Sequence, residues 1–199
     1  MEKSAGKLRK HFDEITNRAL LWLLSKSEVA RCDGIIICDP EESEQFRTTI
    51  IAALQLVKDT DQRRFERIKK HLKWILKCTL DEPSAQYRRD IQACVMDFTF
   101  AQLKSDSEMN AAYFAKVLVH ESTHGVVASR GIRYAPELRL RIEKLCVTEE
   151  NRFLNRLALT HPEIAENLHQ DFDPTRWEKS WKISRGGSTL RVFYRLFFK

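Results

Sequence analysis

Residues 109–130 most constrain the fold of this chain, because they combine a helical pattern with polar groups inside an apolar stretch. The segment contains no proline, and Asp106 or Ser107 can cap its start. Its apolar side chains recur at helical spacing; among them are Phe114, Val117, Leu118 and Val126. We therefore expect a helix here that is mostly buried.

The sequence His120-Glu121-Ser122-Thr123-His124 lies inside this predicted helix and has the form H-E-x-x-H. Helical residues four apart are separated by about 40° around the axis, so both imidazoles can reach one metal ion. Burial would leave His120, Glu121 and His124 without polar partners unless something bound them. Imidazole nitrogen is a common zinc ligand. We expect His120 and His124 to hold a metal, and Glu121 to be the general base that acts on a metal-bound water.

The residues around this motif resemble those of the zincin metallopeptidases. Zincins have a small β-branched residue three positions before the first histidine, which is Val117 here. They have uncharged residues inside the motif, here Ser122 and Thr123, and an apolar residue two positions after it, here Val126. The resemblance covers residues 109–158. It implies a zinc-dependent metallohydrolase, in particular a peptidase, with one Zn²⁺ per chain.

Zincin subclasses differ in the third metal ligand. The metzincin pattern needs glycine and histidine where this chain has Val127 and Arg130, so the chain does not fit that subclass. The gluzincin pattern places a glutamate on a second helix. Glu143 follows His124 by nineteen residues, which gives H-E-x-x-H-x18-E. The resemblance therefore implies Glu143 as the third ligand.

A second helix is predicted from Pro136 to about residue 159, after Gly131 ends the first. The short connection makes the two helices antiparallel neighbours. The phase of the second helix leaves its ligand open: Glu149 falls within the apolar stripe, whereas Glu143 and Glu150 share another face. Each of the three is a candidate ligand, and Glu150 could instead orient a ligand by hydrogen bonding.

Two further side chains are candidates for stabilising a transition state. Tyr134 lies in the turn between the predicted helices, where its phenol could donate to an oxyanion, although packing would equally explain it. His161 follows the second helix and precedes Pro162. A loop histidine of this kind is either an ordinary surface residue or an additional site residue.

The whole chain predicts an α+β fold that is mostly helical, with a small sheet ahead of the metal-binding helix pair. Besides that pair, we expect helices over residues 1–30, 42–58 and 61–72 and strands over 34–38 and 92–98. Residues 74–78 fit either a helix or a strand. The resemblance implies an edge strand beside the cleft, for which residues 93–98 are the candidate.

The length of 199 residues suits a single zincin-like domain. We divide residues 1–199 by their expected content into helices plus a small sheet (1–105), the metal-binding helix pair (106–160) and short C-terminal helices (161–199). The five cysteines are odd in number and form no C-x-x-C pair, so buried thiols are expected. No apolar run is long enough for a membrane span, and the start lacks an apolar secretory core, which favours a cytoplasmic protein.

The formal net charge is +6, from 34 Lys and Arg against 28 Asp and Glu. Part of the excess is concentrated between residues 63 and 77, in Arg63, Arg64, Arg67, Lys69, Lys70, Lys73 and Lys77. Such a cluster is most often a solvated face, but it can contact phosphates or an acidic partner. The partner implied by the resemblance is a peptide or protein substrate. A membrane is not an expected partner. The alternative is a catalytically silent zincin-like binding or regulatory protein whose basic surface faces nucleic acid or an acidic partner.

Overall fold

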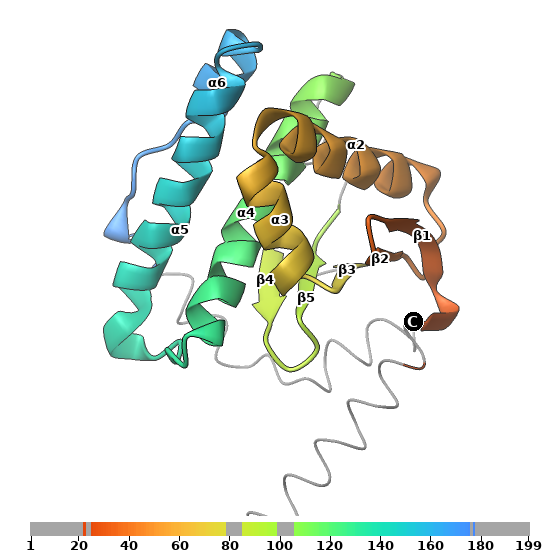
Figure 1. The fold of residues 1–199 in the computed structure, drawn as a ribbon, viewed down its shortest axis with the longest axis horizontal. Helices are drawn as coiled ribbons and strands as arrows, with labels where there is room; N and C mark the ends of the chain where they lie inside the picture. Colours follow the sequence, from red (N-terminus) through yellow and green to blue (C-terminus); the bar gives the residue numbers. More distant parts are fainter. Residues whose placement is uncertain (1–21, 23–24, 79–84, 99–105, 176, 178–199) are drawn as a thin grey trace, which may run out of the picture.

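The computed structural model describes residues 22, 25–78, 85–98, 106–175 and 177, and these have an α+β fold (Figure 1). The strands are β1 (Glu28–Cys32), β2 (Ile35–Cys38), β3 (Trp74–Lys77), β4 (Ala85–Arg88) and β5 (Ala93–Met96). The helices are α2 (Glu44–Thr60), α3 (Gln62–His71), α4 (Ser107–Ser129), α5 (Pro136–Leu157) and α6 (Pro162–Leu168). The predicted fold class is confirmed, since the sheet precedes the helix pair α4–α5 that carries the H-E-x-x-H motif.

The strands form one mixed sheet in the order β1-β2-β3-β5-β4. The central pairs β2–β3 and β3–β5 are parallel, and the outer pairs β1–β2 and β4–β5 are antiparallel. All four residues of β5 are buried, as expected for a strand covered on both faces. The expectation that residues 93–98 form the edge strand is therefore wrong. Among the described strands, the edge on that side is β4, which has only exposed or partly buried residues.

Most elements begin and end within two residues of their predicted positions. Residues 74–78, which fitted either structure, contain the strand β3. The predicted helix over residues 1–30 falls largely outside the described residues, but it is wrong at its end, where Glu28 begins β1. The reason is the tight turn at Asp33 and Gly34, whose φ angles of 47° and 87° are those of a hairpin turn. That turn pairs β1 with the buried strand β2.

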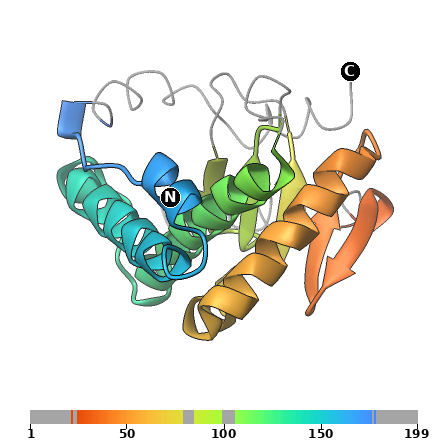
Figure 2. The same cartoon turned by 90° about the horizontal axis from the view of Figure 1, so that it is seen from above.

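The helix α4 lies in the middle of the molecule and is buried along most of its length. It packs against α2 on one side and α5 on the other, and it also contacts α3, α6 and the strands β4 and β5. Figure 2 shows α5, α4 and α2 side by side in that order. Aromatic rings join α2 and α4 to the end of the sheet: Phe98 lies 5.1 Å, centroid to centroid, from both Phe46 and Phe114. None of the helices in the described part of the chain has the length and apolarity that a membrane span requires.

Replacing Gly125 with alanine should destabilise the protein. Its added Cβ would lie 2.6 Å from the Cβ of His71 on α3, so the two helices would have to move apart. An interior Gly→Ala change normally stabilises a helix by about 1 kcal/mol. Here we expect urea unfolding to show a loss of about 1–3 kcal/mol instead.

Ser129→Ala is the matched control, because Ser129 is exposed at the end of the same helix. It should change the free energy of unfolding by no more than about 0.5 kcal/mol. A Gly125→Ala protein as stable as the wild type would show that α3 and α4 are not in close contact at this position.

Candidate metal centre

The two motif histidines lie on the side of α4 that faces α5. The helix begins at the predicted cap, where the side chain of Asp106 accepts hydrogen bonds from the backbone N–H groups of Glu108 and Met109 at 2.8 and 3.3 Å. His120 and His124 lie four residues, about one turn, apart on this helix, and their Nε2 atoms are 3.2 Å apart. Both rings therefore present the nitrogen that a shared metal ion would bind.

The helix α5 brings Glu143 to these nitrogens. One of its carboxylate oxygens lies 3.2 Å from His120 Nε2, and the other lies 3.7 Å from His124 Nε2. Glu143 is only 2% exposed. The structure thus brings together the three residues that the gluzincin pattern singles out.

Cys146 also belongs to this group. One ligand atom each from His120, His124 and Cys146 lie within 4.8 Å of one another, so this buried group could hold a metal ion. Burial raises the pKa of the Cys146 thiol well above its usual value, and the charge of Glu143 adds to this effect. The sequence predicted only a buried thiol here. Its position three residues after Glu143 places both side chains on one helix face, which could have identified it.

One carboxylate oxygen at this site, Oε2 of Glu121, is buried without a hydrogen-bond partner in the described part of the protein. Oε2 of Glu143 is also buried; it pairs with Nε2 of His120 at 3.2 Å, but without the geometry of a hydrogen bond. An unpaired buried acceptor costs about 1–3 kcal/mol, and more when it is charged. A cation bound among the imidazoles would compensate for this cost. The donor set and the unpaired oxygen of Glu121 therefore fit a bound metal ion.

Glu150 occupies the outer side of His120. Its carboxylate binds Nδ1 of His120, which leaves Nε2 for a metal. The other oxygen of Glu150 accepts from Gln170 at 3.2 Å and lies 3.4 Å from Nζ of Lys116. This is the arrangement of a residue that orients a ligand, one of the two roles considered for Glu150.

Tyr134 lies at the edge of the site. Its hydroxyl donates a hydrogen bond to Glu143 and accepts one from Nε of Arg139 at 3.0 Å. Its ring meets that of His124 edge-on, with centroids 5.4 Å apart. The residue thus contacts both His124 and Glu143, and its O–H donor is used by Glu143.

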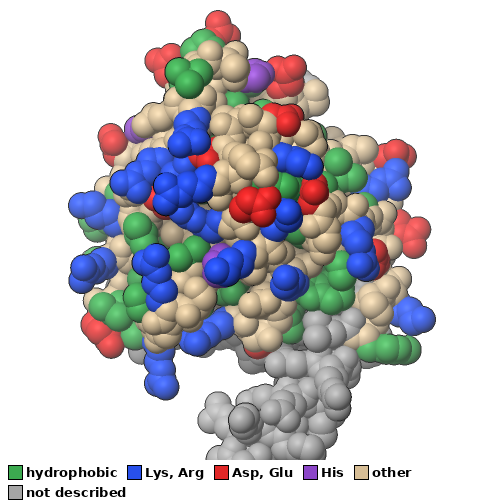
Figure 3. Space-filling view, in the orientation of Figure 1, with side chains coloured by type: hydrophobic (Ala, Val, Ile, Leu, Met, Phe, Trp, Pro, Cys, Tyr) green, Lys and Arg blue, Asp and Glu red, His purple; other side chains and the backbone are tan. Residues whose placement is uncertain are grey.

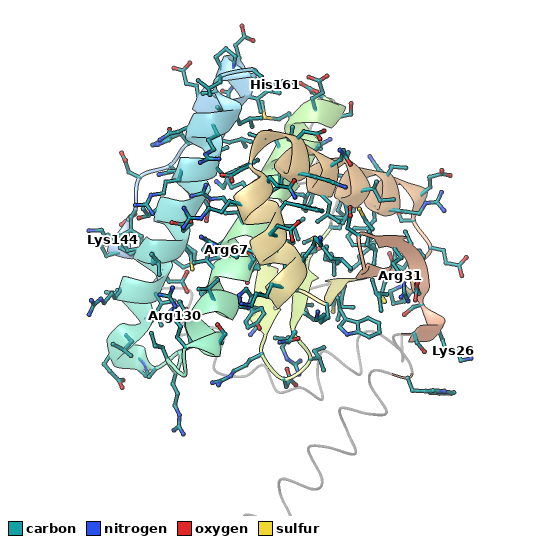
Figure 4. All side chains as sticks on the ribbon, in the orientation of Figure 1. Lys26, Arg31, Arg67, Arg130, Lys144 and His161 are labelled. Carbon is teal, nitrogen blue, oxygen red and sulfur yellow. The ribbon has the colours of Figure 1, made fainter. Side chains whose placement is uncertain are left out.

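The structure does not bring Glu149 or His161 to the motif histidines. The carboxylate of Glu149 accepts from Arg64 at 2.9 Å, from Arg67 at 2.7 Å and from Arg152 at 2.6 Å. His161 precedes α6, where its Nδ1 lies 2.8 Å from the hydroxyl of Thr160. Figure 4 shows His161 at the end of α5 where α6 begins.

Burial and neighbouring carboxylates set the protonation of the site. Burial raises the pKa of Glu121 to about 7, and the positive charge of His120 opposes this shift. Burial lowers the pKa of His120, but Glu143 and Glu150 outweigh that effect and raise it to about 10. Burial and the charge of His120 lower the pKa of His124 to about 4. Without a metal, a proton therefore resides on His120 between two carboxylates while His124 stays neutral, and a metal binding at Nε2 of His120 would displace that proton.

Two other residues of the site were not singled out from the sequence. Lys116 is buried one turn before His120, and its Nζ donates to the carbonyl of Leu168 at 3.1 Å. Trp177 stacks on His120 with ring centroids 5.7 Å apart and planes at 20°. Both contacts join residues far apart in the chain, so no local sequence pattern indicates them.

Comparison of the chain with models of protein families, with curated protein sequences and with solved structures gave no match. The assignment of the site therefore depends on its own geometry and chemistry.

We expect purified protein to bind one zinc ion per chain and His124→Ala to lose it. Removing a direct ligand should weaken binding by more than the about 10–100-fold that changes to ligand-orienting residues cost. Metal content by mass spectrometry, with and without added zinc, is the measurement. His161→Ala is the matched control and should keep its zinc. No zinc uptake by the wild type, or equal losses in both variants, would contradict a metal centre at the motif.

Proposed function

We propose that this protein is a zinc-dependent hydrolase and that it cleaves peptide bonds. The observation that carries the proposal is the convergence of His120, His124 and Glu143 beside Glu121, whose Oε2 is buried without a hydrogen-bond partner in the described part of the protein. Two histidines and one glutamate are among the ligand sets that catalytic zinc uses, because they leave a position for water or substrate. The resemblance of the motif to zincin metallopeptidases points the same way.

Nε2 of His120, Nε2 of His124 and the carboxylate of Glu143 would hold the zinc. When bound, zinc polarises a substrate carbonyl and lowers the pKa of its bound water to about 7. Cys146 is the rival to Glu143 as third ligand, because its sulfur lies in the same group. If both bound, four protein donors would close the site, as in structural zinc centres. Under this proposal Cys146 would remain a buried thiol that does not bind the metal.

Glu121 would act as the general base and acid. It lies between the metal ligands on α4, is 5% exposed, and accepts a hydrogen bond from the backbone N–H of Tyr87 on β4. That bond orients the carboxylate and leaves its other oxygen, which lacks a protein partner, to accept a proton from the attacking water. The same carboxylate would then give this proton to the leaving amine, so that hydrolysis returns it to its starting state.

Glu150 and Tyr134 would prepare this arrangement. Glu150 fixes the orientation of His120 through Nδ1, and Lys116 helps to hold Glu150 in place. Tyr134 positions Glu143 by donating its single O–H to that carboxylate, and it would have to release this bond to donate to the oxyanion formed at the substrate carbonyl. Neither residue would need to exchange a proton with the substrate.

The strand β4 favours a peptide as the substrate. It is the outermost strand of the described sheet on this side, it contacts α4, and its Tyr87 bonds to Glu121. An extended peptide can add to such an edge through backbone hydrogen bonds. The peptide would then pass beside the general base. The resemblance implied an edge strand of this kind at residues 93–98, and β4 would take its place.

Glu121→Gln should keep its zinc and lose about 10²–10⁴-fold in peptide cleavage, because the amide cannot accept the proton of the water. Cleavage is measured by mass spectrometry on a mixed peptide library. The control is Glu108→Gln, the same change at the exposed first turn of the same helix. Undiminished cleavage by Glu121→Gln would exclude this role for Glu121.

The third ligand can be identified with cobalt in place of zinc. We expect Glu143→Ala to lose metal affinity, Cys146→Ala to keep it, and the cobalt-loaded wild type to lack the intense near-ultraviolet absorption of a thiolate ligand. The reverse pattern would replace the proposed centre with a His-His-Cys site. Glu137→Ala, at the exposed start of α5, is the control for an acidic residue removed from that helix.

A further inference from the structure

A second polar cluster lies between α3 and α5, separate from the metal centre. It lines a pocket of about 330 Å³ whose residues are Arg63, Arg64, Arg67, Glu149, Arg152, Asn155 and Arg156. Figure 3 shows basic side chains gathered over these two helices, and Figure 4 places Arg67 between them. We call this cluster the arginine pocket.

The acids in and beside the arginine pocket are already occupied. Glu149 accepts from three arginines through its two oxygens, as described above. Asp61, which is fully buried, binds the side chain of Arg64 and lies 3.2 Å from that of Arg156. Five arginines against two carboxylates leave three positive charges unbalanced.

Hydrogen-bond donors are in excess as well. Each guanidinium carries five N–H donors, far more than two carboxylates can accept. Nε of Arg64 is buried and has no hydrogen-bond partner in the described part of the protein. The side chains of Arg152 and Arg156 are 61% and 52% exposed, and Arg63 is exposed too. The pocket therefore combines buried arginines with arginines that a ligand from solvent can reach.

The charge and size of the pocket indicate the class of ligand. An arginine guanidinium group can bind two phosphate oxygens at once, and several guanidinium groups can bind the same phosphate. A surplus of three positive charges matches a diphosphate or triphosphate group better than a single carboxylate. A volume of about 330 Å³ is near the lower end of the roughly 300–1,000 Å³ of small-molecule sites. We propose that the arginine pocket binds a small ligand through a diphosphate or triphosphate group.

A concave site favours a small ligand over nucleic acid. A duplex backbone is bound mainly by exposed basic side chains on an open surface. In the arginine pocket, Arg64 of α3 and Glu149 of α5 are both buried, at 7% and 6% exposure, and their side chains meet at 2.9 Å. A ligand bound there would contact both α3 and α5 and would stabilise the folded protein.

The test is calorimetric titration of the full chain with inorganic pyrophosphate and with ATP, beside thermal unfolding. We expect saturable binding of one ligand per chain and a higher melting temperature. Arg63→Gln and Arg152→Gln should each weaken binding by about tenfold, since each removes a charged hydrogen-bond donor. Both residues are exposed, so the melting temperatures of the free variants should stay close to that of the wild type.

Arg47→Gln is the matched control for Arg152→Gln. Arg47 is also exposed and also pairs with a glutamate three residues away, but it lies on α2. It should leave binding unchanged. Because phosphates can also bind zinc, the titration is repeated with His124→Ala, which should bind pyrophosphate as the wild type does.

Four results would overturn the proposal. The first is no saturable binding of pyrophosphate or ATP at millimolar concentration. The second is an equal loss in Arg47→Gln. The third is the disappearance of binding in His124→Ala. The fourth is binding of a DNA duplex that falls steeply with salt and is weakened by Arg63→Gln and Arg152→Gln but is not displaced by pyrophosphate, which would make the cluster a nucleic-acid surface.

Discussion

The structure depends on the burial of α4 with three ionisable side chains of its motif inside the molecule. Buried ionisable groups are costly unless they are paired or bind a metal. Their partners come from two directions: Glu143 and Glu150 from α5, and the backbone of Tyr87 from β4. The helix pair and the edge of the sheet are thus fixed around the same residues. The arrangement that gives the motif residues their polar partners is therefore also the one that buries the core.

Local sequence signals predicted the elements well but not the order of the strands. The cap Asp106 and the proline Pro136 mark the starts of α4 and α5, because capping and helix-start preferences act within one turn. A buried strand such as β5 shows only that both of its faces are covered. Which strand lies outermost is decided by long-range pairing, so the edge strand could not be identified. The β1–β2 hairpin was missed although Asp33-Gly34 is a strong turn sequence.

The same distinction between local and long-range information applies to the site. The spacing of His120 and His124 fixes their common face, and the separation of Glu143 and Glu150 by seven residues fixes theirs, so these four could be proposed from periodicity and resemblance. Lys116 could not, because its role depends on long-range contacts such as that with Glu150, whereas Cys146 shares the helix face of Glu143 and could have been identified from that spacing. For Glu149, the apolar stripe was misleading. Glu149 is buried because arginines of α3 neutralise its charge.

The adjacent residues Glu149 and Glu150 show how the rotation of α5 is fixed. Neighbouring helical side chains point about 100° apart, so Glu150 reaches His120 while Glu149 reaches Arg64 and Arg67. Breaking a buried ion pair on one side typically costs about 3–5 kcal/mol, because the other charge stays buried. A rotation of α5 about its axis in either direction would break the ion pairs of Glu149 and those of Glu150 at the same time. The arginines of α3 therefore hold the glutamates of the metal centre in register without touching the metal centre themselves.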